Sequence, residues 1–208
     1  LYIEKIALHL GLADTADEFH REYDDLDILI NRHHWCESKG FYFDLYARIP
    51  ATDRHNFLNQ KTVASFWPIL SGVADEPRMG QLLGHLLNPE EFYTLHPVPS
   101  LSRDNPNYDP LGGYWLGGVW APTNYMVVRG LAERKKHDIA RDIAVAHISA
   151  MSKVLNDKDY ASIWECYSPE YIRPASYKNG EDSLVRPAFV GWSGLGPVAM
   201  LIENVFSL

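Results

Sequence analysis

The spacing of apolar residues predicts a protein built mainly from helices. In several segments apolar side chains recur every three or four residues, which places them on one face of a helix. In one of these segments Asp14 or Thr15 is the expected N-cap of a long helix. Pro68 is expected to interrupt another, and the last segment is apolar nearly all round, as in a fully buried helix. The predicted helical segments are 1–12, a long helix from about residue 14, 62–72, 76–87, 118–133, 138–155 and 192–206.

Between these segments the pattern changes. Residues 35–46, WCESKGFYFDLY, alternate over short distances around Lys39-Gly40, which predicts a β-hairpin or tight loop. Residues 48–60, 92–113 and 157–187 are polar or irregular and are expected to be loops. The loop 92–113 is longer than most connections in a compact domain, and such loops usually have a function.

The order of the helices favours a layered, all-α architecture. A hydrophobic helix that follows an aromatic-rich loop alternates with a longer amphipathic helix, as in 62–72 with 76–87 and 118–133 with 138–155. This alternation suggests the inner and outer layers of an α/α toroid, with about three helix pairs when the terminal helices are counted. An irregular helical bundle is the alternative. The chain is expected to form part of a single domain over 1–208.

Composition narrows the possible partners. The 208 residues carry a net charge of -8, which argues against nucleic acid as a partner and gives no basic patch for an anionic membrane. No apolar stretch is long enough to span a bilayer. The two cysteines, Cys36 and Cys166, are expected to be free thiols, which leaves cytoplasm and periplasm both open, with the cytoplasm favoured. The chain begins at Leu1 inside an apolar pattern, so it is expected to belong to something longer.

The stretch 114–131, YWLGGVWAPTNYMVVRGL, is the first candidate for a binding site. Tyr114, Trp115 and Trp120 lie just before a predicted helix, and Gly117-Gly118 would let the backbone approach closely. Aromatic faces of this kind suit the C–H faces of a sugar ring. A tryptophan-rich core loop without binding function is the alternative.

Hydrolysis of a glycoside requires two carboxyl groups flanking the scissile bond. Three acidic residues lie in aromatic surroundings rather than on predicted helix faces: Glu37, Asp44 and Glu165. Glu165 is the best candidate because Trp164 and Cys166 flank it, and partial burial would tune its pKa. Alternatively, Glu165 caps a helix or pairs with an arginine.

The nine histidines do not predict a metal site. His33 and His34 are adjacent at a helix end and point to different faces, whereas His85, His96, His137 and His147 are scattered along the chain. The sequence also lacks a phosphate-cradling glycine loop, and GWSGLG at 191–196 is only superficially similar to a nucleophile elbow. We therefore expect no cofactor.

Three motifs resemble one enzyme family. YWLGGVWAPTNYMVVRGL resembles the tyrosine–tryptophan signature of glycoside hydrolase family 63 and the related trehalase-like enzymes. GFYFDL resembles that group's G-F-Y-x-D segment, and WECYSPE followed by FVGWSGLGPVAMLIENV resembles the segment with the catalytic base and the final inner helix. Among the members, the bacterial branch containing mannosylglycerate hydrolases is the most similar.

The resemblance implies an (α/α)6 toroid and an inverting glycosidase. Glu165 matches the general base of the family. The positions that match sugar-contacting or motif residues are Trp67, Tyr114, Trp115, Trp120, Asn124, Trp192, Tyr42 and Asp44. The family's general acid, an aspartate in a G-W-D-type motif, has no counterpart in this chain, which would be the C-terminal half of a toroid or a truncated relative.

Two classes of function follow from the resemblance. The first is an inverting glycosidase acting on a small α-linked glycoside or oligosaccharide, with this chain carrying the base and the aromatic subsite. The second is a carbohydrate-binding or structural α/α module that lacks the acid. The expected partners are a carbohydrate and either the missing N-terminal half of the domain or a second copy of the chain.

Overall fold

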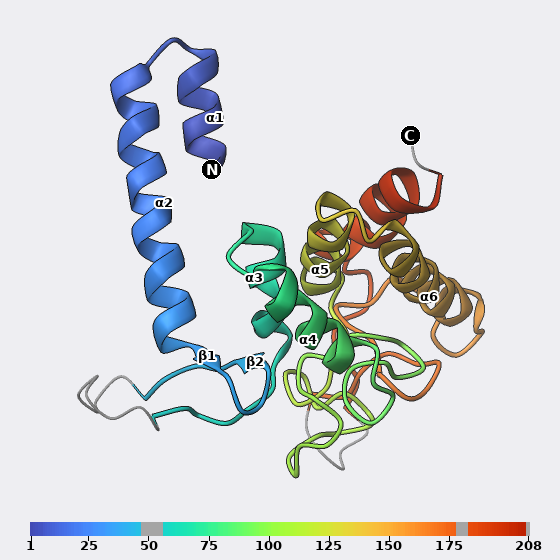
Figure 1. Cartoon of the computed structure of the whole chain (residues 1–208). Coiled ribbons are helices and arrows are strands. Elements are labelled where there is room, and N and C mark those ends of the chain that lie inside the picture. Colours follow the sequence, from blue (N-terminus) through green and yellow to red (C-terminus); the bar gives the residue numbers. More distant parts are fainter. Residues whose placement is uncertain (47–55, 178–182, 207–208) are drawn as a thin grey trace.

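The computed structural model describes residues 1–46, 56–177 and 183–206, and this part of the chain is mostly helical (Figure 1). Two short strands form a hairpin near the N-terminal helices, and long irregular segments gather below the helices in Figure 1. The elements are α1 (Tyr2–His9), α2 (Ala13–His33), β1 (Trp35–Cys36), β2 (Phe41–Tyr42), η1 (Val63–Phe66), α3 (Trp67–Ser71), α4 (Glu76–Leu86), α5 (Ala121–Glu133), α6 (His137–Asn156), η2 (Trp192–Gly194) and η3 (Gly196–Val205).

The helices α1 and α2 form an antiparallel hairpin that extends beyond the rest of the molecule in Figure 1. The prediction that Asp14 or Thr15 caps the long helix is wrong, because α2 begins at Ala13 with Leu12 as its N-cap and without a side-chain cap. The turn at Gly11, with φ +73°, lets Ala16 N–H bond Leu12 C=O, so the helix starts earlier. Asp14 instead lies in the first turn, where its negative charge interacts favourably with the positive end of the helix dipole.

The predicted hairpin over 35–46 is confirmed. The strands β1 and β2 are antiparallel, with Trp35 opposite Tyr42 and Cys36 opposite Phe41. Gly40 forms the turn at φ +58°. A Cβ at that position would overlap Gln81 Oε1 of α4, so the turn packs tightly on that helix.

Pro68 starts a helix rather than interrupting one, which corrects the prediction for 62–72. The segment opens with the 3₁₀ turn η1 and continues as α3, in which Pro68 occupies the first turn and needs no N–H partner. The helix α4 begins as expected at Glu76-Pro77. Its N-cap is Asp75, whose carboxylate accepts a hydrogen bond from Arg78 N–H at 2.9 Å.

The helix α5 lies at the centre of the helical layer, packed between α3 and α6, and η3 packs on α6 (Figure 1). The expected pairing of α5 with α6 is confirmed. The helix α3 lies against α5, and α4 joins them in one hydrophobic core. Its most buried members include Phe66, Ile69, Met79, Leu82, Leu86, Val128 and Leu131.

The prediction of a fully buried α-helix over 192–206 is wrong in two respects. The segment is a 3₁₀ turn, η2, followed by the π-helix η3. Only the face with Gly196 and Met200 is buried against α6, while Trp192, Val198 and Phe206 are exposed. The segment is apolar on all sides, but no element in the described ranges covers its outer face.

None of the helices in the described residues combines the length and the apolar character that a membrane span requires. Within the described residues, Cys36 and Cys166 are free thiols. Cys36 is half-buried, and Cys166 is buried.

Candidate functional site

A tight loop before α5 presents Tyr114 and Trp115. Asp109 holds this loop closed, because its N–H donates to Leu116 C=O at 2.8 Å and its carboxylate accepts from Leu111 N–H at 2.9 Å. Tyr114 itself has φ +60°, a backbone conformation that non-glycine residues seldom adopt. At Gly118 a Cβ would overlap Tyr114 C=O, so only glycine permits the loop to fold back on itself here.

Glu165 lies in the loop between α6 and η2, and it is only 5% exposed. Its backbone N–H donates to Arg186 C=O at 3.0 Å. The Ser193 hydroxyl, from η2, donates to Trp164 C=O at 2.8 Å and approaches Glu165 C=O at 3.2 Å. The next residues pair with the segment that precedes α5, where Tyr167 and Val119 exchange backbone hydrogen bonds. The main chain on both sides of Glu165 is therefore fixed.

Two tyrosine hydroxyls orient the Glu165 carboxylate. Tyr114 Oη donates to Oε1 at 3.0 Å, and Tyr177 Oη donates to Oε2 at 3.4 Å. Burial, together with the hydrogen bond to Glu165, raises the pKa of Tyr114 to about 12. Tyr114 therefore keeps its proton at neutral pH and acts as a donor, and both carboxylate oxygens serve as acceptors. These two hydrogen bonds fix the orientation of the carboxylate.

A cluster of aromatic side chains is joined to this carboxylate through Tyr114, whose ring contacts Trp115 and Trp120. Trp115 and Trp120 stack face to face, with ring centroids 4.2 Å apart and an interplanar angle of 10°. Tyr114 and Trp192 each meet Trp120 edge-on, at 4.8 Å and 5.6 Å. Trp120 is only 1% exposed, whereas Trp115 and Trp192 are 49% and 43% exposed. Trp115 and Trp192 therefore offer open indole faces, and Trp120 supports them from behind.

Asn124 lies in the core rather than at the surface. Its side-chain NH₂ donates to Pro97 C=O at 3.0 Å and lies 3.1 Å from His147 Nδ1. The histidines are scattered along the sequence, but His96 Nε2 lies 3.0 Å from His147 Nδ1. Burial, and then the neighbouring His147, lower the pKa of His96 well below its usual value, and burial lowers the pKa of His147 to about 4. The described residues contain no group of three or more potential metal ligands.

The remaining predicted residues lie apart from Glu165. Tyr42 and Asp44 line a separate hollow of about 140 Å³ beside Pro68, with Tyr42 Oη donating to Asn31 Oδ1 at 2.6 Å. Trp67, the first residue of α3, is 38% exposed. Glu37 accepts a hydrogen bond from the indole N–H of its hairpin neighbour Trp35. Within the described ranges, none of these side chains has a hydrogen bond to Glu165 or to the two tyrosines that hold its carboxylate.

Sequence reasoning missed Tyr177, Ser193 and Asp109. Tyr177 and Ser193 are distant in sequence from Tyr114, and only the fold brings them to Glu165. Of these three, Asp109 could have been found from the sequence. It precedes Pro110 and the glycines of the aromatic loop, and an aspartate in such a position often closes a turn with its side chain.

Residues 1–174 match the family described as the mannosylglycerate hydrolase MGH1-like glycoside hydrolase domain. An uncharacterized protein of Borreliella burgdorferi is 28% identical over 208 residues, which are 99% of this chain and 43% of that protein. The mannosylglycerate hydrolase of Thermus thermophilus is 32% identical over 101 residues, 48% of this chain and 22% of that enzyme.

Solved structures show the same fold. The family 63 mannosylglycerate hydrolase from Thermus thermophilus, in complex with Tris and D-glycerate, superimposes with a TM-score of 0.69 at 21% identity, over 94% of this chain and 40% of that one. The neutral trehalase of Saccharomyces cerevisiae gives 0.64 at 17% identity, over 84% and 28%. The helices therefore form part of an (α/α)6 toroid, and the chain spans about two fifths of the length of these mannosylglycerate hydrolase structures. With the family match over 1–174, the chain belongs to the mannosylglycerate hydrolase MGH1-like glycoside hydrolases.

Proposed function

We propose that this chain supplies the general base and the aromatic sugar subsite of an inverting glycosidase that acts on a small α-linked glycoside or oligosaccharide. The observation that carries the proposal is Glu165 itself. It is a buried carboxylate, fixed by two tyrosine hydroxyls, and the ring of one of these tyrosines, Tyr114, contacts the indoles of Trp115 and Trp120. Such a carboxylate can take a proton from water while Trp115 and Trp192 hold the sugar ring.

The general acid is expected from residues outside this chain. In an inverting site the acid and base carboxyls lie roughly 6.5–9.5 Å apart, which leaves room for a water molecule. The other two acidic candidates, Glu37 and Asp44, belong to the β1–β2 hairpin segment and make their contacts there. Because Glu37 and Asp44 make their contacts away from Glu165, neither is placed to act as its partner acid. This also favours the second candidate function, a carbohydrate-binding or structural module without catalysis.

Apolar side chains on the surface support an incomplete assembly. Exposed ones cluster on the α1–α2 hairpin: Ile3, Ile6, Leu8, Leu10, Leu12, Leu26, Ile28 and Leu29. A helical hairpin with this many exposed apolar side chains is typical of a surface that a partner covers. We propose that the remainder of a toroid, or a second copy of the chain, covers this face. Only the former would bring a general acid that this chain does not supply.

The test replaces Glu165 by Gln in an enzyme that contains the whole toroid. Because the base is lost, we expect kcat to fall by about 10²-fold or more, while sugar affinity and the urea midpoint stay near those of the parent. Glu90→Gln, at a glutamate whose side chain is 79% exposed, serves as the matched control and should leave kcat unchanged. An NMR spectrum of the first product released should show the inverted anomer.

Near-full turnover by Glu165→Gln would remove Glu165 from the mechanism. Sugar binding without any turnover by the parent enzyme would favour the non-catalytic module. Robust hydrolysis by the 208-residue chain without added partner would place the acid among the carboxylates of this chain that have structural contacts.

A further inference from the structure

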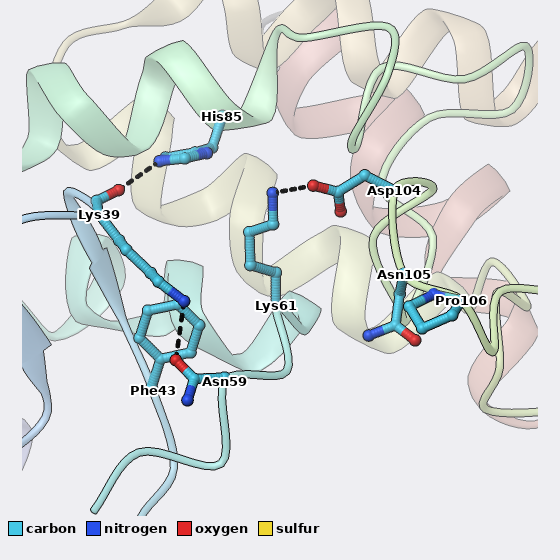
Figure 2. A pocket seen from close by; sticks show the side chains of 8 residues that line it. All are labelled: Lys39, Phe43, Asn59, Lys61, His85, Asp104, Asn105 and Pro106. Atoms are coloured by element: carbon cyan, nitrogen blue, oxygen red, sulfur yellow. Dashed lines mark hydrogen bonds and ion pairs between the residues drawn. The ribbon is translucent and has the colours of Figure 1, made fainter. Parts of the chain in front are cut away.

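A cavity of about 350 Å³ opens beside the β1–β2 hairpin (Figure 2). The hairpin turn, the end of α4, and the segments 59–61 and 104–106 form its walls. None of the residues that surround Glu165 lines it. Lys39, Lys61 and His85 all extend toward this space in Figure 2.

The walls of the cavity are held in place by contacts between these segments. His85 Nε2 donates to Lys39 C=O at 2.9 Å, and His85 Nδ1 lies 2.6 Å from Glu91 Oε2. The turn cannot shift toward α4, because Gly40 already packs against Gln81. On the opposite side, Ser102 N–H bonds Lys61 C=O at 3.0 Å and fixes the segment that carries Lys61.

The carboxylates near the cavity already have partners. Lys61 Nζ pairs with Glu91 Oε2 at 3.0 Å and with Asp104. Asp104 also accepts from Ser102 Oγ at 2.7 Å, and although burial opposes the charge, the bonds from Lys61 and Ser102 leave the pKa of Asp104 below its usual value. These acceptors are thus largely occupied by protein donors.

Lys39 differs from Lys61. Its ammonium donates to Asn59 Oδ1 at 2.8 Å and lies 5.3 Å from the centre of the Phe43 ring. No carboxylate of the described segments lies within ion-pair distance of it. An ammonium has three N–H donors, so two are left unused by the described residues. Asn59 Nδ2, whose partner within the same ranges is Phe57 C=O, has another. The cavity therefore has an excess of donors over acceptors.

We propose that this cavity binds a small molecule that carries an oxyanion, such as a sugar acid or a sugar phosphate. The carboxylate or phosphate oxygens accept hydrogen bonds from Lys39 and Asn59, while Phe43 and Pro106 form the apolar part of the wall. This binding does not depend on Glu165 or on catalysis.

The test is a calorimetric titration of the full chain with three matched sugars, glucose, glucuronate and glucose 6-phosphate, and with inorganic phosphate. We expect at least one anionic sugar to bind, and Lys39→Gln to weaken it by about tenfold, as for the loss of one charge-assisted hydrogen bond. Lys158→Gln, an exposed lysine after α6, is the charge-matched control and should bind as the parent does. The comparison of glucuronate, glucose 6-phosphate and phosphate identifies which oxyanion is recognised.

A second variant separates an anion site from a general sugar site. Asp104→Asn removes a negative charge from the wall and should strengthen the binding of the anionic sugars. Weaker binding by Asp104→Asn, unchanged binding by Lys39→Gln, or no binding of any anion at millimolar concentration would each overturn the proposal.

Discussion

At the scale of single residues, Trp115 and Trp120 have different roles although their rings stack. Trp120 is expected to contribute mainly to stability, and Trp115 mainly to sugar affinity. Trp120 is 1% exposed and contacts three other aromatic rings, whereas Trp115 is 49% exposed. Trp120→Ala should therefore lower the free energy of unfolding by roughly 3–5 kcal/mol, as expected for a large buried side chain. Trp115→Ala should cost less than about 1 kcal/mol in stability but about 0.5–1.5 kcal/mol in sugar affinity.

Urea unfolding and a fluorescence titration with sugar measure the two effects. Trp192→Ala, the other exposed indole, is a useful comparison for Trp115→Ala. Equal stability losses in Trp115→Ala and Trp120→Ala would contradict the division into an open face and a buried support. Unchanged sugar affinity in Trp115→Ala would remove that residue from the subsite.

The burial of Glu165 could be predicted from its neighbours, because Trp164 and Cys166 favour a buried segment, and the structure confirms it at 5% exposure. Its partner Tyr177 could not be predicted, because that tyrosine lies in a polar segment that gives no periodic signal. The tertiary fold, rather than local pattern, also decides that Asn124 faces His147. Residue type predicted which side chains are candidates, and packing decided which of them meet.

At the scale of elements, Gly130 of α5 makes a close contact with the backbone of α3. A Cβ at this position would lie 2.8 Å from Leu70 N of α3, and a backbone atom cannot move aside as a flexible side chain can. The late glycine in α5 therefore sets the distance between the two helices. This explains why a residue with poor helix propensity occurs in a helix of 13 residues.

Gly130→Ala should lower the free energy of unfolding by about 1–3 kcal/mol, because the added methyl group forces α3 and α5 apart. Gly84 of α4 is the matched control, since a Cβ there meets no atom within 4 Å. Gly84→Ala should instead stabilise the chain by about 0.5–1 kcal/mol through helix propensity. Chemical denaturation of both variants checks the prediction, and a gain in stability from both would show that the α3–α5 contact is looser than described.

Local chemistry predicted some elements well. Lys39-Gly40 indicated the turn of the hairpin, and Glu76-Pro77 marked the start of α4. The prediction of a buried helix over 192–206 was wrong, because hydrophobicity indicates how apolar a surface is and not what covers it. Pro68 was misread for a related reason, since a proline fits the first turn of a helix as well as it breaks an interior.

At the scale of the whole molecule, the order of hydrophobic and amphipathic helices was sufficient to predict the all-α class and the pairing of α5 with α6. The toroid itself came from the family resemblance, because the described chain spans only part of the toroids that it matches. The contact between α3 and α5 and the buried histidine pair could not be read from periodicity. Both depend on residues that are far apart in sequence.

The histidine pair joins three parts of the molecule. His96 comes from the loop after α4, His147 from α6, and Gly196 of η3 packs so close to His147 that a Cβ would lie 3.3 Å from its Nε2. Both imidazoles are buried, at 1% and 0% exposure. Burial lowers the pKa of His147 to about 4 and that of His96 well below 6.5, so both are neutral in the folded chain.

This burial makes stability depend on pH. In the unfolded chain the two side chains titrate near 6.5, so below that pH the unfolded state binds protons that the folded state does not, and for His147 this holds down to its folded pKa of about 4. The free energy of unfolding is therefore highest above about pH 6.5 and falls as the pH decreases, by about 1.4 kcal/mol per pH unit for each histidine. Urea midpoints at pH 7 and pH 5 measure this loss. His147→Gln, which does not titrate, should show a smaller difference between the two pH values. His137→Gln, an exposed control on the same helix, should retain the full difference. An equal pH dependence in the parent and in His147→Gln would show that other groups cause the loss.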